Sequence, residues 1–155
     1  MEEGSEGQTL ILGLGNVLLG DEGVGIHAVR ELEKRALPSH VDVIDGGTLG
    51  LGLLDLMKGY EWVVIVDAVD AGDEPGTILR FTPQEVASKD QALPLSLHQT
   101  EILKVLELAS YLGQTLPPIV IYGIQPQFMA WSTELSPTLQ AKLSALIDAV
   151  LEEVT

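Results

Sequence analysis

The sequence lacks cysteine and has few aromatic and few basic residues. The absence of cysteine excludes a disulfide framework and a thiolate nucleophile. Because only 5% of the residues are aromatic, the core must be built from Leu, Val, Ile and Ala. The 8 Lys and Arg residues are scattered and face 23 Asp and Glu, which gives a net charge of −15 and argues against a nucleic-acid partner. This charge favours solubility, or attraction to a cation or a basic segment.

Long apolar runs are also missing. No stretch approaches the roughly 20 apolar residues of a membrane span. The first seven residues are acidic and polar, unlike a signal peptide. We therefore expect a soluble, cytoplasmic protein with no membrane partner. With 155 residues, 46% of them hydrophobic, the chain has the size and composition of one domain over residues 1–155.

Short apolar runs alternate with helical patterns along the chain, which is typical of an α/β domain. The patterns predict five strands, at residues 9–12, 40–44, 62–66, 77–81 and 118–124. Helices are predicted at 23–36, 51–57 and 101–112, and after an N-cap Ser136 that precedes Pro137. The expected fold is a three-layer α/β/α sandwich with a five-stranded, mostly parallel sheet. The strand at 77–81 follows only a short turn, so we expect it to run antiparallel to the strand before it.

In such sheets, ligands bind beyond the carboxyl ends of the strands, near the point where the strand order reverses. The common strand order places the first and third strands on either side of that point. Polar residues that directly follow these two strands are therefore candidates for a functional site.

A glycine-rich turn, residues 13–25, joins the first strand to the first helix. Its glycines permit a tight turn and close approach by another group. The dinucleotide-binding fingerprint needs a third glycine where this chain has Leu18, and Asp21 and Glu22 would place negative charge beside a pyrophosphate. A nucleotide-binding module therefore stays only as an alternative. Taken singly, Asp21 and Glu22 are most simply explained as capping residues of the helix that follows.

Asp67 directly follows the apolar run that ends at Val66. A carboxylate at the end of a buried central strand is costly unless it is paired, hydrated or bound to a metal. We expect Glu22 and Asp67 to face each other across one crevice at the switch point.

His98 precedes the third long helix, within Ser96-Leu97-His98-Gln99-Thr100. Its simpler interpretation is a capping histidine, but we favour it as a functional group over His27 and His40. Glu22, Asp67 and His98 form an oxygen, oxygen, nitrogen set that suits a divalent ion such as nickel or zinc. Neither a zincin HExxH pattern nor a serine nucleophile elbow is present.

Asp45, in Asp45-Gly46-Gly47-Thr48, is a fourth candidate because it also follows a predicted strand. Asp and Gly at these positions otherwise indicate a local turn. The pattern differs from the Asp-Thr/Ser-Gly motif of aspartic proteases. Phe128, Met129 and Trp131 could form a partner surface, but we expect them to pack in the core.

These segments, in this order, resemble the nickel–iron hydrogenase maturation proteases. The resemblance covers nearly the whole chain and rests on the ordered set rather than on one motif. The matching segments are Gly13-Leu14-Gly15-Asn16, Asp21-Glu22-Gly23, Asp45-Gly46-Gly47-Thr48, Val66-Asp67-Ala68, Pro75-Gly76-Thr77, Ser96-Leu97-His98-Gln99, Gly123-Ile124-Gln125-Pro126 and Leu135-Ser136-Pro137.

The resemblance implies an endopeptidase of the aspartyl type that removes the C-terminal extension of a hydrogenase large-subunit precursor after nickel insertion. It implies that Glu22, Asp67 and His98 bind metal: nickel supplied by the precursor, with zinc or cadmium as other ions for the same site. It also implies that Asp45, Gly46, Gly47 and Thr48 select the precursor. Glu22, Asp67 and Asp45 are then the catalytic candidates. The alternatives are a non-catalytic metal-binding chaperone, a nucleotide-binding module, or a protease of this fold with another substrate.

Overall fold

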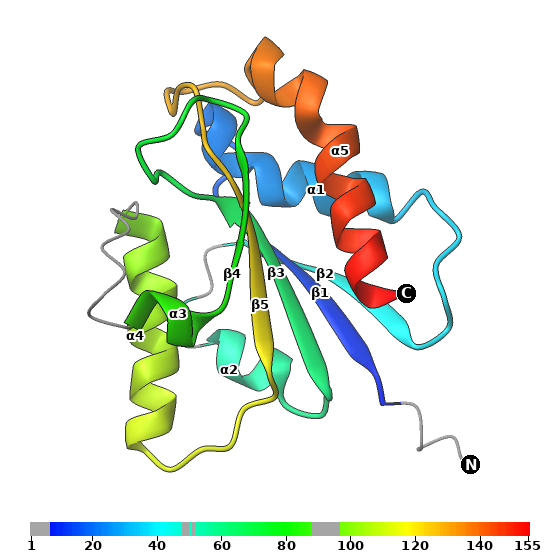
Figure 1. The fold of residues 1–155 in the computed structure, drawn as a ribbon, viewed down its shortest axis with the longest axis vertical. Helices are drawn as coiled ribbons and strands as arrows, with labels where there is room; N and C mark the ends of the chain where they lie inside the picture. The colour runs from blue at the N-terminus through cyan, green and yellow to red at the C-terminus, as the bar shows by residue number, and fades with distance from the viewer. Residues whose placement is uncertain (1–6, 48–49, 51, 88–96) are drawn as a thin grey trace.

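The computed structural model describes residues 7–47, 50, 52–87 and 97–155, without the side chains of 86, 87 and 97–101 (Figure 1). One five-stranded sheet, in the order β2-β1-β3-β5-β4, organises the chain. The strands are β1 Thr9–Leu14, β2 Val41–Gly47, β3 Trp62–Ala68, β4 Ile78–Phe81 and β5 Ile119–Ile124. The helices are α1 Val24–Leu32, α2 Gly52–Met57, α3 Pro83–Ala87, α4 Leu97–Tyr111 and α5 Pro137–Val154, with a 3-10 turn η1 at Gly20–Gly23.

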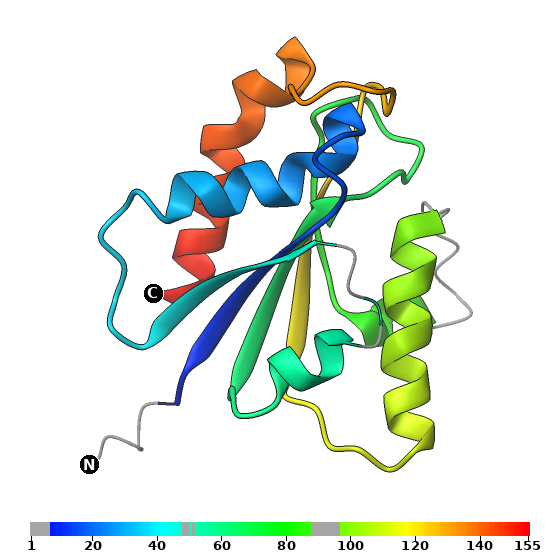
Figure 2. The ribbon, with the colours of Figure 1, turned by 180° about the vertical axis from the view of Figure 1, so that it is seen from behind.

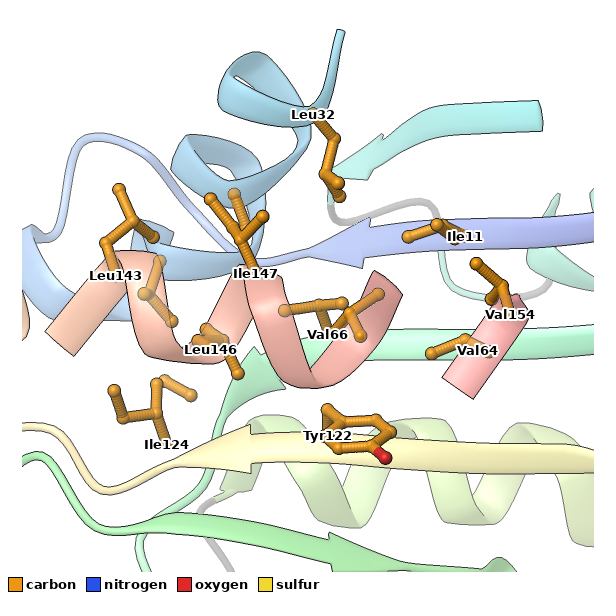
Figure 3. Packing of buried hydrophobic residues seen from close by; sticks show 14 of the residues in the cluster. Ile11, Leu32, Val64, Val66, Tyr122, Ile124, Leu143, Leu146, Ile147 and Val154 are labelled. Carbon is orange, nitrogen blue, oxygen red and sulfur yellow. The ribbon is translucent and has the colours of Figure 1, made fainter. Parts of the chain in front are cut away.

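Helices cover both faces of the sheet, which confirms the expected three-layer α/β/α sandwich (Figures 1 and 2). Side chains alternate between the faces along each strand. Ile11, Val64 and Tyr122 pack under α1 and α5 (Figure 3). Leu12 and Ile65, each one residue along its strand, belong to the second core under α2 and α4.

The strand directions agree with the sequence-based expectation. β1, β2, β3 and β5 are parallel, and β4 is antiparallel. β4 pairs with β5 rather than with β3, the strand before it in the chain. β5 follows α4 in the chain and occupies the position beside β3, with Val63 opposite Ile119. The short strand β4 is therefore left at the edge of the sheet.

Two strands are longer than the sequence indicates. β1 continues through Gly13 to Leu14, and β2 extends through Asp45 to Gly47. At Gly13, a Cβ atom would lie only 2.3 Å from the carbonyl oxygen of Gly25, so the glycine serves the packing of α1 against the strand rather than ending it. The first helix is shorter than predicted: it was expected over residues 23–36 and ends at Leu32. The short helix α3 was not predicted from the sequence.

The last helix forms as the sequence predicts. Ser136 is its N-cap, and its Oγ accepts a hydrogen bond from the Leu139 backbone N–H at 3.3 Å. Pro137 occupies the first helical position. The predicted apolar stripe is buried against the sheet: Leu139, Leu143, Leu146, Ile147 and Val150. Within the described ranges, no helix is both long and apolar enough to cross a membrane.

Candidate active site

Three loops meet at the carboxyl ends of β1, β3 and β5: residues 15–23, 69–77 and 125–136 (Figures 1 and 2). Backbone hydrogen bonds join the third loop to the other two. Gly20 N–H donates to the Ser132 carbonyl, and Gly76 N–H donates to the Gln125 carbonyl, both at 2.8 Å. The loops therefore form one connected rim at the edge where ligands bind in sheets of this type.

Two glycines allow the turn after β1 to fold back tightly onto the sheet. Gly15 has a φ of +130°, and a Cβ there would lie 2.0 Å from the Glu22 carbonyl oxygen. At Gly25, a Cβ would lie 2.3 Å from the carbonyl oxygens of both Leu14 and Val66. The start of α1 therefore crosses the ends of β1 and β3 at close range. Glycine at these positions is needed for close backbone approach.

Asp67 lies near the end of β3, the central strand, and is fully buried. One of its carboxylate oxygens, Oδ1, accepts a hydrogen bond from the Ala68 backbone N–H at 2.8 Å. Val63, Ile65 and Val69 belong to the core under α2 and α4, so the alternation of β3 places Asp67 on that face. The sequence-based placement of Asp67 at the carboxyl edge of the sheet is correct.

Glu22 lies within η1, is partly exposed, and is carried by a turn that contacts β3. The chain thus brings the turn that carries Glu22 against the strand that carries Asp67. This contact agrees with the predicted neighbouring positions of the first and third strands.

Asp21 has a structural role that the sequence did not reveal. Its side chain does not cap α1, whose N-cap is Gly23. The buried carboxylate instead accepts backbone N–H bonds from Gln127 at 2.8 Å and Phe128 at 3.1 Å. It also accepts bonds from the backbone N–H and hydroxyl of Ser136 at 2.7 and 2.8 Å. The expectation that it caps the following helix is wrong because the loop before α5 lies closer to it.

The Asp45 segment forms a local turn. Asp45 is exposed near the end of β2, and its Oδ1 accepts a hydrogen bond from the Gly47 backbone N–H at 2.9 Å. Gly47 has a φ of +50°, a conformation that favours glycine. Asp45 is opposite Gly13 in the register, so this segment reaches the same edge as the turn after β1. Thr48 lies outside the described residues.

His98 lies in the first turn of α4, and its side chain is outside the described set. Among the side chains that are described, no three His, Asp or Glu residues could hold a metal ion. The set of Glu22, Asp67 and His98 therefore stays a prediction. α4 begins at the level where β3 ends, on the face toward which Asp67 points (Figures 1 and 2).

His27 is half-buried in α1, and burial is the main cause that lowers its pKa. Nearby Arg30 lowers it further, against a hydrogen bond to the Thr133 backbone and the charge of Asp21. Its Nε2 atom is buried without a hydrogen-bond partner among the described residues. The neutral form of His27 is therefore favoured in the folded protein, where α1 lies near the loop before α5.

Gln125 fixes the loop that follows β3. Its side-chain oxygen accepts backbone N–H bonds from Ala71 at 2.8 Å and Asp73 at 3.2 Å. Its Nε2 donates to Asp70 Oδ1 at 3.1 Å. The buried amide thus holds the loop at 69–77 in one conformation beside the end of β3.

The expectation that Phe128, Met129 and Trp131 pack in the core is wrong. They are 40%, 41% and 79% exposed, and Leu18 on the adjoining turn is 49% exposed. The backbone of the loop before α5 is hydrogen-bonded to the turn after β1, and these side chains lie on the surface of the rim.

Comparisons of the sequence and of the fold with known proteins point to one family. A sequence profile of the hydrogenase maturation proteases matches residues 26–153. The hydrogenase expression/formation protein HupD of Bradyrhizobium diazoefficiens is 36% identical over 145 residues, which are 92% of this chain and 76% of that protein.

Solved structures of related proteins agree with this match. The hydrogenase maturating endopeptidase HybD of Escherichia coli superposes with a TM-score of 0.79 at 30% identity, over 95% of this chain and 91% of that one. The [NiFe] hydrogenase maturation protease HybD of Thermococcus kodakarensis gives a TM-score of 0.80 at 27% identity, over 96% and 99%. The chain therefore belongs to the hydrogenase maturation protease family and is a peptidase of that family.

Proposed function

We propose that this peptidase removes the C-terminal extension of a [NiFe]-hydrogenase large-subunit precursor, and that it recognises nickel already inserted in that precursor. The observation that carries the proposal is the contact between η1, with Glu22, and β3, with the buried Asp67, in a chain of this family. The name of the Thermococcus relative includes a [NiFe] hydrogenase, which supports nickel as the metal of the substrate.

Glu22 and Asp67 offer carboxylate oxygens, and His98 offers an imidazole nitrogen. Nickel accepts such mixed oxygen and nitrogen donors and leaves further positions for its ligands in the precursor. Zinc or cadmium would occupy the same donor set. Because the surrounding rim is rich in acids, a cation carried by the substrate is attracted there. Contact with nickel would fix the scissile peptide at the edge of the sheet.

The reaction is peptide-bond hydrolysis. A water molecule attacks the scissile carbonyl carbon, its proton passes to a carboxylate, and the C–N bond breaks as the leaving amine takes up a proton. Glu22 and Asp67 are the proposed carboxylates at the reacting centre. We propose that Asp45 and the following Gly46, Gly47 and Thr48 contact the precursor and select it. The site of action that we propose is the cytoplasm.

The test is cleavage of purified precursor, with and without inserted nickel, by the wild type and by Glu22→Gln, Asp67→Asn and His98→Ala. We expect the wild type to cleave only the nickel-loaded precursor, and each variant to lose about 100-fold or more in kcat/KM. The exposed carboxylate Asp148 on α5 supplies a control, since Asp148→Asn should cleave at the wild-type rate. Equal cleavage of the nickel-free precursor removes the sensing role, and wild-type rates in all three variants remove the site.

Two alternatives would give different results in the same assay. A metal-binding chaperone would bind nickel without cutting any precursor. A protease of this fold with another substrate would leave the precursor intact in both metal states. Family membership favours the peptidase over the chaperone.

A further inference from the structure

Four large apolar side chains are exposed together on the rim. Leu18 comes from the turn after β1, and Phe128, Met129 and Trp131 come from the loop before α5. We call these four residues the rim patch. Leu19 pairs with Ser132 in an isolated β-bridge, so their chain neighbours Leu18 and Trp131 lie beside each other. Single exposed apolar residues are common, but a group of this size on neighbouring segments indicates an interaction surface.

The rim patch rests on a fixed backbone. Ser132 N–H donates to the Leu18 carbonyl at 2.9 Å, and Gly20 N–H donates to the Ser132 carbonyl at 2.8 Å. Buried Asp21 holds the backbone of Phe128 from the other side, through its carboxylate and its own N–H. The apolar side chains are thus presented by a rigid scaffold. A preorganised surface loses less conformational entropy on binding than a flexible one.

Charge on the same rim decides what kind of partner fits. The three loops at 15–23, 69–77 and 125–136 contain no Lys or Arg. Two of these loops carry exposed acids: Asp70, Asp73 and Glu74 on the loop 69–77, and Glu134 on the same loop as Trp131. A matching surface therefore combines apolar side chains with Lys or Arg. A second copy of this chain, with a net charge of −15, would bring acids against acids.

The rim patch adjoins the proposed nickel-contacting turn. Asp21 holds Phe128, and the next residue in the chain is Glu22. A protein that covers the patch therefore has an adjacent segment near the edge where β3 ends, one residue after Asp67. Resting on the proposed function, we propose that the rim patch is the docking surface for an apolar, basic surface on the folded hydrogenase precursor, next to the segment that is cut.

The test compares Trp131→Ala with Tyr111→Ala, which removes an equally exposed aromatic residue from the far end of α4. Binding of nickel-loaded precursor is measured by interferometry, and cleavage is measured as separate kcat and KM values. We expect Trp131→Ala to weaken binding and raise KM by about tenfold or more while kcat stays within about twofold. Tyr111→Ala should match the wild type. Circular dichroism and the unfolding midpoint check that both variants are folded.

A change of charge on the rim gives an independent test. Glu134→Lys should slow association with the precursor by about threefold or more, and higher salt should slow association of the wild type. Binding and KM that are unchanged in both Trp131→Ala and Glu134→Lys overturn the docking surface, even where the wild type cleaves the precursor. A wild type that binds the precursor through Trp131 without cutting it supports docking but overturns the proposed function. Self-association that Trp131→Ala abolishes, seen by analytical ultracentrifugation, assigns the patch to a second copy and overturns the proposal.

Discussion

The carboxylate of Asp21 and the N-cap residue Ser136 form two hydrogen bonds across 115 positions of the chain. Asp21 Oδ1 accepts from the Ser136 backbone N–H at 2.7 Å, and Oδ2 accepts from its hydroxyl at 2.8 Å. The same hydroxyl accepts from Leu139 N–H in the first turn of α5. One buried acid thus connects the turn after β1 with the start of the last helix, and it holds the rim in place.

We expect Asp21→Ala to lower the free energy of unfolding by about 3 kcal/mol or more. The substitution leaves the buried N–H donor of Ser136 and the partly buried N–H donor of Phe128 without their acceptor. Urea denaturation followed by circular dichroism measures the loss. The exposed Asp73→Ala is the control and should stay within about 0.5 kcal/mol of the wild type. Equal stability of both variants would contradict an anchoring role for Asp21.

Ser136→Ala should cost about 1–2 kcal/mol, because α5 loses its N-cap and Asp21 loses a donor. A double-mutant cycle with Asp21→Ala should give a coupling energy of about 1 kcal/mol, since both residues belong to one network. The measurement is again urea denaturation. Strictly additive effects would show that the two side chains act independently.

Gly15→Ala should destabilise the turn that carries Glu22. The added Cβ would lie 2.0 Å from the Glu22 carbonyl oxygen, and the φ of +130° also disfavours alanine. We expect a loss of about 2 kcal/mol or more in thermal or urea unfolding, together with lower kcat. Gly59→Ala is the comparison for backbone conformation, because Gly59 has a φ of +89° and nothing lies within 4 Å of its Cβ position. An equal loss in both variants would assign the effect to backbone conformation alone.

His27 predicts a pH dependence of stability. Burial lowers its pKa below the ordinary value of about 6.5, so the unfolded chain binds a proton more readily than the folded one. Its contribution to stability is therefore complete above about pH 6.5 and is lost as the pH falls through the folded pKa. Denaturation at pH 7.5, 6.5 and 5.5 should show a shallower decline for His27→Gln than for the wild type. An unchanged slope in His27→Gln would contradict this assignment.

Asp45 can be tested by a matched pair of variants. Asp45→Asn keeps a side-chain oxygen for the Gly47 N–H, whereas Asp45→Ala removes it. Because Asp45 is exposed and its carboxylate holds the turn, we expect Asn to retain kcat and Ala to raise KM for the precursor by about fivefold. Loss of kcat in the Asn variant at unchanged stability would instead make the charge of Asp45 part of the chemistry.

Much of the local structure could be predicted because it is encoded by nearby residues. The β-branched run from Trp62 to Val66 predicts the central strand, and Ser136 before Pro137 predicts the start of α5. Asp67 could be placed at the sheet edge because it directly follows that run. Glu22 could be placed there because glycine-rich turns after a first strand lead back over the sheet.

The amino-acid sequence by itself determined the alternation of strands and helices, the α/β/α layers and the acidic character of the rim, because hydrophobic periodicity and charge are local properties. Only the tertiary structure decided that Asp21 holds Ser136 rather than capping α1, that β4 pairs with β5, and that Phe128, Met129 and Trp131 are exposed. Each of these depends on which distant segments meet. From the sequence alone, a carboxylate, an edge strand or an apolar side chain is compatible with several partners. The packing of the whole chain selects one of them.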